Sequence, residues 1–295
     1  MKNGVIIINK EEGLTSQGVV SRVKRILGVK KAGHTGTLDP MATGVLPVLI
    51  ERGVKASEFM LTSTKHYEAH LTLGQTSDTE DIWGDVLSRS DALPTDEEFF
   101  AVLDRFRGEI LQTPPMYSAL KVGGRKLCDL ARSGVVIDRT PRPVTIHSLN
   151  ARRIDERTFA LEVECSKGTY IRTLCADIGA ALGCGGVMSA LCRTEASGYP
   201  ISKTHTLAEL EAMTDEERRA CVLPVEDIFR DLAALTLPPF FARLAHAGLE
   251  IYEKKIGMTL PLGTRVRLCD ADGFFAVGEV REYDDGLAIK PIRQF

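Results

Sequence analysis

Several features that would place this chain in a special class of proteins are missing from its sequence. No run of about eighteen apolar residues occurs, so we predict no membrane-spanning segment. The seven cysteines are scattered and never spaced CxxC, which argues against a zinc knuckle and for reduced thiols in a cytoplasmic protein. The start, MKNGVIIINK, is too short and too quickly charged for a signal peptide.

A strong net charge is also missing, because the formal charge of the 295 residues is only −3. The whole-chain balance therefore does not indicate a nucleic-acid partner. Between Lys121 and Arg142, however, six basic residues stand against two acidic ones. By itself such a run is typical of a solvated surface. The length of 295 residues leaves room for one large domain and a small one, or for two medium domains. The hydrophobic content of 44% is ordinary for a globular protein with a full-sized core.

Hydrophobic periodicity places the main elements of the larger domain. Alternating apolar residues predict half-buried strands, and apolar residues three and four apart predict amphipathic helices. Thr15 or Ser16 can cap the first helix and Gly28 can end it, whereas Thr169 can cap the second and Gly183 can end it. The predicted strands cover 5–9, 65–73 and 158–165, and the predicted helices cover 16–27 and 170–182.

Two stretches differ from this pattern. Residues 113–144 are rich in proline, glycine and basic residues, with little room for a core of their own, and long loops of this kind are usually functional or disordered. From Leu235 onward, glycines separate short β-like pieces. We therefore predict a large domain over 1–234 with an insertion at 113–144, and a small β-rich domain over 235–295.

The stretch GHTGTLDP at 33–40 is the first candidate for chemistry. Asp39 precedes a proline, which biases its backbone toward an extended conformation. Gly33 and Gly36 allow positive φ angles or close approach by another molecule. Asp and Gly are also ordinary turn residues, so on this stretch alone a structural turn remains the simpler interpretation of Asp39.

Arg172 gives that aspartate a possible partner. It falls near the start of a predicted helix, where the positive end of the macrodipole disfavours a cation. A carboxylate from elsewhere in the chain would compensate, and an arginine partner would keep Asp39 ionised and oriented. Tyr67 and Tyr170 are either core aromatics or flat surfaces on which a base can stack. The sequence contains no metal-ligand cluster, P-loop or Ser-His-Asp set.

Taken together, these motifs resemble the bacterial tRNA pseudouridine synthase B family over nearly the whole chain. The motifs that carry the resemblance are GHTGTLDPMATGVLP at 33–47, KHYEAHLTLGQTSDTED at 65–81, TPPMYSALKVGGRK at 113–126, CSKGTYIRTL at 165–174 and LCRT at 191–194.

The resemblance implies an α+β pseudouridine synthase fold with a curved, mostly antiparallel sheet and a small PUA-like RNA-binding domain at the C-terminus. It implies isomerisation of the T-loop uridine of tRNA, at position 55, to pseudouridine by base flipping, without metal or organic cofactor. The expected partner is the T-arm of tRNA. We expect a cytoplasmic monomer with no obligatory protein partner and no membrane association.

The resemblance also assigns residues. It implies that Asp39 is the catalytic aspartate, that Tyr67 packs on the target base and handles its C5 proton, and that Arg172 pairs with Asp39. The residues expected to bind the substrate through the pocket or the RNA backbone are His34, Lys55, Tyr170, Leu191, Lys121, Arg132 and Arg142.

Three single residues and one segment depart from the family pattern, and two alternative functions stay open. The departures are Glu11, the segment 51–54 before Lys55, Cys128 and Cys192, which stand where the family usually has other residues. The first alternative is a tRNA-binding or tRNA-folding protein whose catalysis is dispensable. The second is a relative of the guide-RNA-dependent pseudouridine synthases, which work with protein partners.

Overall fold

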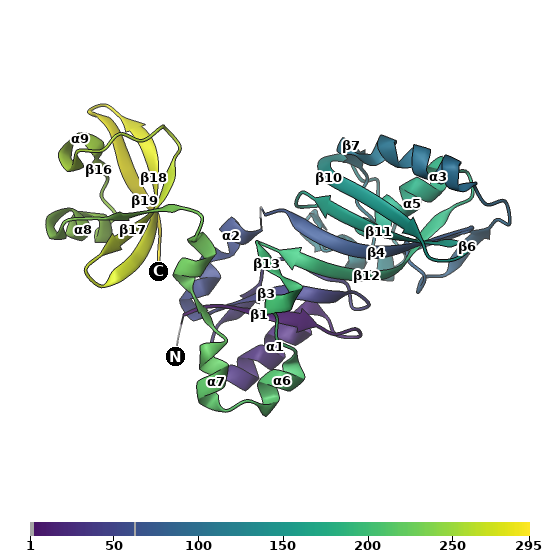
Figure 1. Ribbon diagram of the computed structural model, residues 1–295, viewed down its shortest axis with the longest axis horizontal. Helices are drawn as coiled ribbons and strands as arrows, with labels where there is room; N and C mark the ends of the chain where they lie inside the picture. The colour runs from purple at the N-terminus through teal and green to yellow at the C-terminus, as the bar shows by residue number, and fades with distance from the viewer. Residues whose placement is uncertain (1–2, 62) are drawn as a thin grey trace.

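The computed structural model describes residues 3–61 and 63–295 and contains two main β-sheets (Figure 1). The larger sheet has ten strands in the order β14-β1-β3-β12-β4-β11-β10-β7, with β2 beside β3 and β13 beside β12. These strands are β1 (Gly4–Lys10), β2 (Ala32–His34), β3 (Thr43–Ile50), β4 (Lys65–Leu73), β7 (Gly108–Gln112), β10 (Arg142–Arg153), β11 (Thr158–Cys165), β12 (Gly186–Ala196), β13 (Tyr199–Pro200) and β14 (Leu223–Pro224).

Helices cover the two ends of this sheet. Figure 1 shows α1, α6 and α7 beside β1 and β3, whereas α3 and α5 lie beside β10 and β11. Among the described residues, every helix is too short or too polar to cross a membrane. The helices and 3₁₀ turns are α1 (Ser16–Leu27), η1 (Glu51–Ala56), α2 (Ser57–Met60), α3 (Asp96–Leu103), η2 (Asp104–Phe106), α4 (Leu127–Arg132), α5 (Ile171–Ala181), η3 (Ile201–Lys203), α6 (Leu207–Ala212), α7 (Asp215–Ala220), η4 (Val225–Phe229), α8 (Pro239–His246) and α9 (Glu253–Ile256).

Helix α1 follows the predicted capping chemistry. The Thr15 side chain accepts a hydrogen bond from the backbone N–H of Gly18, and Gly28 ends the helix in the left-handed conformation. Val19, Val20 and Val23 form its buried stripe against the sheet. The first helix and the strand before it are therefore confirmed within a residue of their predicted bounds.

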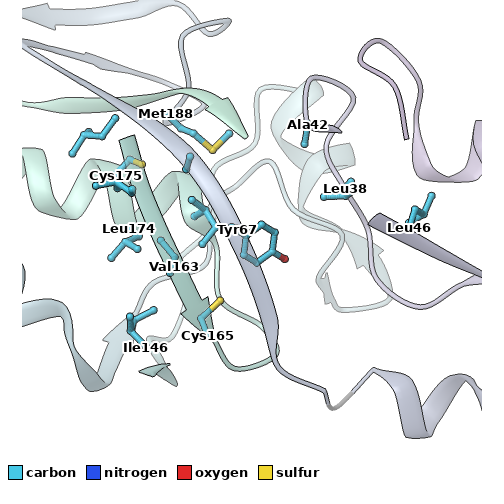
Figure 2. Close-up of a cluster of buried hydrophobic side chains, with 14 of the residues drawn as sticks. Leu38, Ala42, Leu46, Tyr67, Ile146, Val163, Cys165, Leu174, Cys175 and Met188 are labelled. Carbon is cyan, nitrogen blue, oxygen red and sulfur yellow. The ribbon is translucent and has the colours of Figure 1, made fainter. Parts of the chain in front are cut away.

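The centre of the sheet is built on β4, whose alternation the sequence also predicts. Tyr67, Ala69 and Leu71 are buried on one face, whereas the intervening residues are partly or fully exposed. Figure 2 shows the Tyr67 ring at the edge of this core, between the Val163 side of the cluster and the loop that carries Leu38. One aromatic residue thus belongs both to the core and to the region around Asp39.

A parallel pairing brings β12 beside β3. Gly44 makes this approach possible: its φ is +98°, and a Cβ at this position would lie 2.3 Å from the carbonyl oxygen of Arg193. A larger residue would separate the strands. The pairing places Arg193 of β12 next to the start of β3, close to Asp39 in the chain.

The insertion differs from the prediction. We expected residues 113–144 to lack a core, but they form a hairpin of β8 (Lys121–Val122) and β9 (Arg125–Lys126) followed by α4. Met116, Leu127 and Leu130 make a small hydrophobic cluster of their own. Arg142 already belongs to β10, where it pairs with Gln112. The sequence does not predict this core, because its apolar residues are scattered and follow no regular period.

The C-terminal sheet has the order β15-β17-β18-β19-β16. Its first strand starts at Ala233, so the boundary predicted before Leu235 falls inside β15. Phe229 and Phe59 of the larger part pack with Phe274 and Phe295 of the C-terminal sheet in one cluster. The strands of this sheet are β15 (Ala233–Thr236), β16 (Ile251–Tyr252), β17 (Arg265–Asp270), β18 (Gly273–Tyr283) and β19 (Gly286–Gln294). A separate two-stranded hairpin is formed by β5 (Gln75–Ser77) and β6 (Val86–Arg89).

Candidate active site

The loop that carries Asp39 runs from β2 to β3, and buried contacts hold it. Its first residues differ from the predicted loop, since Gly33 and His34 belong to β2 and pair with β3. Leu38 is buried, which contributes about 1.5–3 kcal/mol. The Ser16 hydroxyl donates to the Leu38 carbonyl (3.0 Å) and accepts from its N–H (2.8 Å). The backbone next to Asp39 is therefore fixed.

Lys10 holds the same loop from the end of β1. Its side chain is buried, and the ammonium group donates to the carbonyl oxygens of Glu11 (2.9 Å), Pro40 (3.0 Å) and Ala42 (2.5 Å). Burial lowers the pKa of Lys10 to about 8, and the neighbouring Asp39 carboxylate opposes that decrease. Its donors nevertheless have acceptors, as a buried cation requires.

Asp39 and Arg172 form an ion pair. The Nε of Arg172 lies 3.0 Å from Oδ2 of Asp39. The guanidinium is almost fully buried, with 6% of its side chain exposed, whereas 37% of the Asp39 side chain is exposed. The arginine thus fixes one carboxylate oxygen from inside the protein, and the rest of the carboxylate remains open to a ligand.

Arg172 has further partners that hold it in place. Its Nη1 donates to the Thr79 carbonyl (3.0 Å), and its Nη2 donates to the Tyr117 carbonyl (2.8 Å). The Oδ2 of Asp81 lies 3.8 Å from Nη1. Arg172 is the second residue of α5, where the helix dipole disfavours a cation. These acceptors compensate for that position and orient the guanidinium toward Asp39.

The start of α5 corrects one prediction. We expected Thr169 to cap this helix, but its hydroxyl donates to the Ser166 carbonyl, and the N-cap residue is Tyr170, which makes no side-chain capping bond. Gln112 instead holds the backbone of Tyr170. Its side-chain amide accepts from the Tyr170 N–H (2.8 Å) and donates to the Tyr170 carbonyl (3.0 Å). A distant strand residue therefore positions this end of the helix.

Tyr67 and Arg193 lie together behind the loop. Burial raises the pKa of the Tyr67 phenol, and the positive charge of Arg193 opposes that increase. Arg193 is itself 1% exposed and donates to the carbonyls of Val45 (2.7 Å) and Gly36 (3.2 Å). The phenol therefore lies in an apolar wall with a fixed cation beside it.

A cavity of about 800 Å³ opens over these residues. Asp39, Tyr67 and Arg172 all line it, and so do four of the residues expected to bind the substrate. Burial lowers the pKa of the His34 imidazole, and it raises the pKa of the Tyr170 phenol. The four substrate-binding candidates in the lining are His34, Tyr170, Leu191 and Arg132.

Three predicted residues lie elsewhere. Lys55 is exposed in η1 and donates to the Gln294 carbonyl of the C-terminal sheet (3.0 Å), so the expectation that it lines the pocket is not met. Lys121 and Arg142 are exposed at the hairpin and at the start of β10, outside the cavity lining. The Lys126 side chain lies outside the part of the chain that the structure describes.

Sequence reasoning missed three charged residues of this site. Lys10 and Arg193 are buried cations, and Asp81 has a side chain that is only 13% exposed. A weak signal was present for the first two, because each stands within a predicted or observed strand that also contains a run of apolar residues. Asp81 had no comparable signal, since it lies in a polar turn. Among the described residues, no three His, Cys, Asp or Glu side chains gather as a metal site requires.

A second hollow, of about 280 Å³, lies at the C-terminal end of α1. Arg25 and Arg219 contribute to its lining, but none of the predicted site residues does. Of these two cavities, only the larger is lined by predicted site residues. There, a fixed carboxylate beside a buried phenol is suited to nucleophilic attack followed by proton transfer.

Comparison with known proteins agrees with this arrangement. Residues 24–171 match the family model described as TruB family pseudouridylate synthase (N terminal domain), and residues 172–230 match the tRNA pseudouridylate synthase B C-terminal domain. The protein named tRNA pseudouridine synthase B from Alkaliphilus oremlandii is 42% identical over 96% of this chain and 94% of its own length. The relative of that name from Azoarcus sp. is 42% identical over 94% and 91%.

Solved structures show the same fold. A crystal structure of a Cbf5-Nop10-Gar1 complex matches with a TM-score of 0.72 at 26% identity, over 99% of this chain and 85% of the other. A structure of an H/ACA RNP bound to a substrate RNA matches with a TM-score of 0.72 at 25% identity, over 99% and 84%. The predicted α+β fold with a β-rich C-terminal part is confirmed. Since two family models and full-length relatives cover it, the chain belongs to the TruB family of pseudouridylate synthases.

Proposed function

We propose that this protein isomerises the T-loop uridine at position 55 of tRNA to pseudouridine, with Asp39 as the nucleophile. Family membership makes it an RNA uridine isomerase, and the relatives at 42% identity are named as tRNA enzymes. The observation that carries the residue assignment is the ion pair between Asp39 and Arg172 in the lining of the large cavity.

The proposed chemistry balances within one nucleotide. The bond from C1′ of the ribose to N1 of uracil breaks, and a bond from C1′ to C5 forms. C5 loses a proton and N1 gains one, so no oxidant or reductant is consumed. The Asp39 carboxylate bonds to C1′ as the bond from C1′ to N1 breaks, and C5 of the turned ring then displaces the carboxylate from C1′, which divides the rearrangement into two easier steps. We propose that neither a metal nor an organic cofactor takes part.

The other cavity residues prepare the base for this step. A uridine inside a folded RNA loop must leave its stack before C1′ can reach a carboxylate, and a closed pocket favours the flipped state. Tyr67 packs on the flipped ring and handles the C5 proton, and Arg193 beside it stabilises the charge that then develops. Leu191 closes the apolar wall that excludes water, and His34 and Tyr170 line the entrance.

The same proposal covers the oligomeric state, the need for protein partners and the location in the cell. We propose a cytoplasmic monomer that acts on the T-arm of tRNA without an obligatory protein partner. Of the two matched structures at 25–26% identity, one is of a Cbf5-Nop10-Gar1 complex and the other is of an H/ACA RNP, whereas the full-length relatives at 42% identity are named as tRNA enzymes. A pure tRNA-folding role does not explain why Asp39, Arg172 and Tyr67 meet in one cavity.

A single transcript assay tests this function. Purified protein incubated with an unmodified tRNA transcript is expected to produce pseudouridine at position 55, detected by chemical mapping. A transcript with cytidine at that position is the matched control and should acquire no modification there. If the wild-type protein alone forms no product, a partner-dependent or purely RNA-binding protein becomes the better description.

The basic insertion makes a separate prediction about affinity. Replacing Lys121 and Arg142 together with alanine should weaken tRNA binding and lower the slope of log K against log salt by roughly 1.4, because each phosphate contact on a single strand contributes about 0.7. Both side chains are exposed, and they lie outside the cavity lining to which Arg132 belongs.

Filter binding between 50 and 200 mM salt measures this effect. The matched control replaces Lys24 and Arg25 with alanine. This double substitution changes the net charge by the same amount, but the two residues lie at the end of α1. The control should keep the wild-type slope. Equal slopes in the wild type and the insertion variant would remove Lys121 and Arg142 from the RNA interface.

A further inference from the structure

The sole tryptophan of the chain, Trp83, lies at the catalytic cavity. It belongs to the turn between β5 and β6, and 41% of its surface is exposed. Among the residues that the structure describes, no other aromatic ring or cation packs on its indole. A large flat apolar surface thus faces a cavity in which we propose that RNA binds.

The turn that carries Trp83 is held by its own hydrogen bonds. The Asp81 carboxylate accepts from the Thr79 hydroxyl (2.6 Å) and from the Trp83 backbone N–H (3.1 Å). The Ile82 N–H donates to the Met188 carbonyl of β12 (2.9 Å). Gly84 admits no side chain, because a Cβ there would lie 2.1 Å from the Thr79 hydroxyl. The indole is therefore presented on a fixed backbone, which reduces the entropy lost on binding.

The same turn also holds the catalytic arginine. The Thr79 carbonyl accepts from Nη1 of Arg172, and Asp81 lies 3.8 Å from that nitrogen. One carboxylate, Asp81, thus contacts both the Trp83 backbone and the guanidinium that pairs with Asp39. The backbone that carries the indole is consequently linked to Asp39 through Asp81 and Arg172.

Resting on the proposed function, we propose that Trp83 is a substrate-binding residue that stacks on a base of the RNA, next to the uridine that enters the cavity. Flipping one nucleotide breaks its stacking on both neighbours, and an aromatic ring at the cavity edge replaces the lost contact. Base–aromatic stacking contributes a binding effect of roughly five- to a hundredfold for each base. Because the contact is uncharged, it adds affinity without adding salt dependence.

The exposed apolar side chains of the β5–β6 hairpin suggest an alternative ligand, another protein, and the test must distinguish it from RNA. Val86 and Leu87 on β6 are also exposed, and together with Ile82 they could bind another protein. These side chains do not line the cavity, whereas Trp83 does. Arg132 and Lys167 line the same cavity and supply positive charge, which suits a polyanion. The observations therefore favour RNA.

Fluorescence tests the proposal directly, because the sole tryptophan has no background from another. The Asp39→Asn variant is titrated with unmodified tRNA transcript, so that no turnover changes the ligand. Stacking of a base should quench the emission of Trp83 with the same midpoint that filter binding reports. Unchanged emission at tRNA concentrations that saturate filter binding would overturn the proposal.

Substitutions in the otherwise unaltered chain supply the second readout. Trp83→Ala and Trp83→Leu should each raise the Kd for tRNA roughly tenfold, whereas Trp83→Phe should stay within about threefold of the wild type, since only phenylalanine retains a flat ring. The salt slope should not change, because the lost contact is uncharged. Leu87→Ala, on the same hairpin outside the cavity, is the matched control and should bind like the wild type.

Each outcome has one meaning. If Trp83→Leu binds as well as Trp83→Phe, the side chain contributes apolar area and stacking is excluded. If Leu87→Ala weakens binding as much as Trp83→Ala, the exposed face of the hairpin acts as a whole and the proposal fails. Absence of pseudouridine with the wild type would overturn the proposed function instead, and it would be seen in a different assay from the fluorescence change.

Discussion

Asp39→Asn is expected to lower kcat for pseudouridine formation on the order of 10⁴-fold or more, as removal of a nucleophile does in other covalent enzymes. The substitution keeps the size of the side chain and an oxygen that can accept from Nε of Arg172, which lies 3.0 Å from the carboxylate in the wild-type protein. Only the negative charge and the nucleophilicity are lost. Single-turnover kinetics with labelled transcript measure the change.

Binding and folding should survive the same substitution. The Leu38 and Lys10 contacts that hold the loop use backbone carbonyls of the loop and not the Asp39 carboxylate. The Kd for tRNA should therefore change by less than about threefold. Asp215→Asn is the matched control, because Asp215 pairs with Arg218 (3.1 Å) on α7, away from the cavity. Full turnover by Asp39→Asn would contradict the assignment of Asp39 as nucleophile.

Arg172→Ala is expected to lower both turnover and stability. It removes the partner of Asp39 and leaves Asp81 without its buried cation, and it also strands the carbonyls of Thr79 and Tyr117. Breaking a fully buried ion pair from one side costs about 3–5 kcal/mol, and the cost here should be smaller because 37% of the Asp39 side chain is exposed. We expect kcat to fall on the order of 10³-fold, by analogy with loss of one preorganised electrostatic contact, and the Tm to fall measurably.

Arg172→Lys separates the two effects. A lysine keeps the charge but has one nitrogen, so it cannot reach Asp39, Thr79 and Tyr117 at once. This variant should fold with a smaller loss of Tm and still turn over at least a hundredfold more slowly than the wild type, whereas tRNA binding should change little. Arg281→Ala, which removes an exposed ion pair with Glu279, is the control for surface charge and should cost less than about 1 kcal/mol. Equal losses in binding and turnover would show that Arg172 acts mainly on RNA affinity.

Local pattern predicted the elements well wherever one face of a segment is buried. The alternation of β4 and the capping residues of α1 are short-range features, so each can be recognised within about ten residues. The core of the insertion could not be recognised this way. Met116 and Leu130 meet only because the hairpin between them folds back, and no local period records that contact.

The site shows the same division. Arg172 at the start of a helix indicates a need for a carboxylate partner, and Asp39 is the residue that the structure places there. The expectation for Lys55 followed from a motif match alone. In the structure this lysine instead reaches the C-terminal sheet at Gln294, a contact with a segment more than two hundred residues away.

The sequence by itself determined which residue types are available for chemistry, the family they resemble, and the strands and first helix that carry them. Tertiary structure alone decided that Lys10, Arg193 and Asp81 surround Asp39 and Tyr67. It also decided that Trp83 faces the same cavity. The physical reason is that these residues act through backbone carbonyls and burial. Neither carbonyl position nor burial is encoded at a single residue, because both depend on which distant strands pack together.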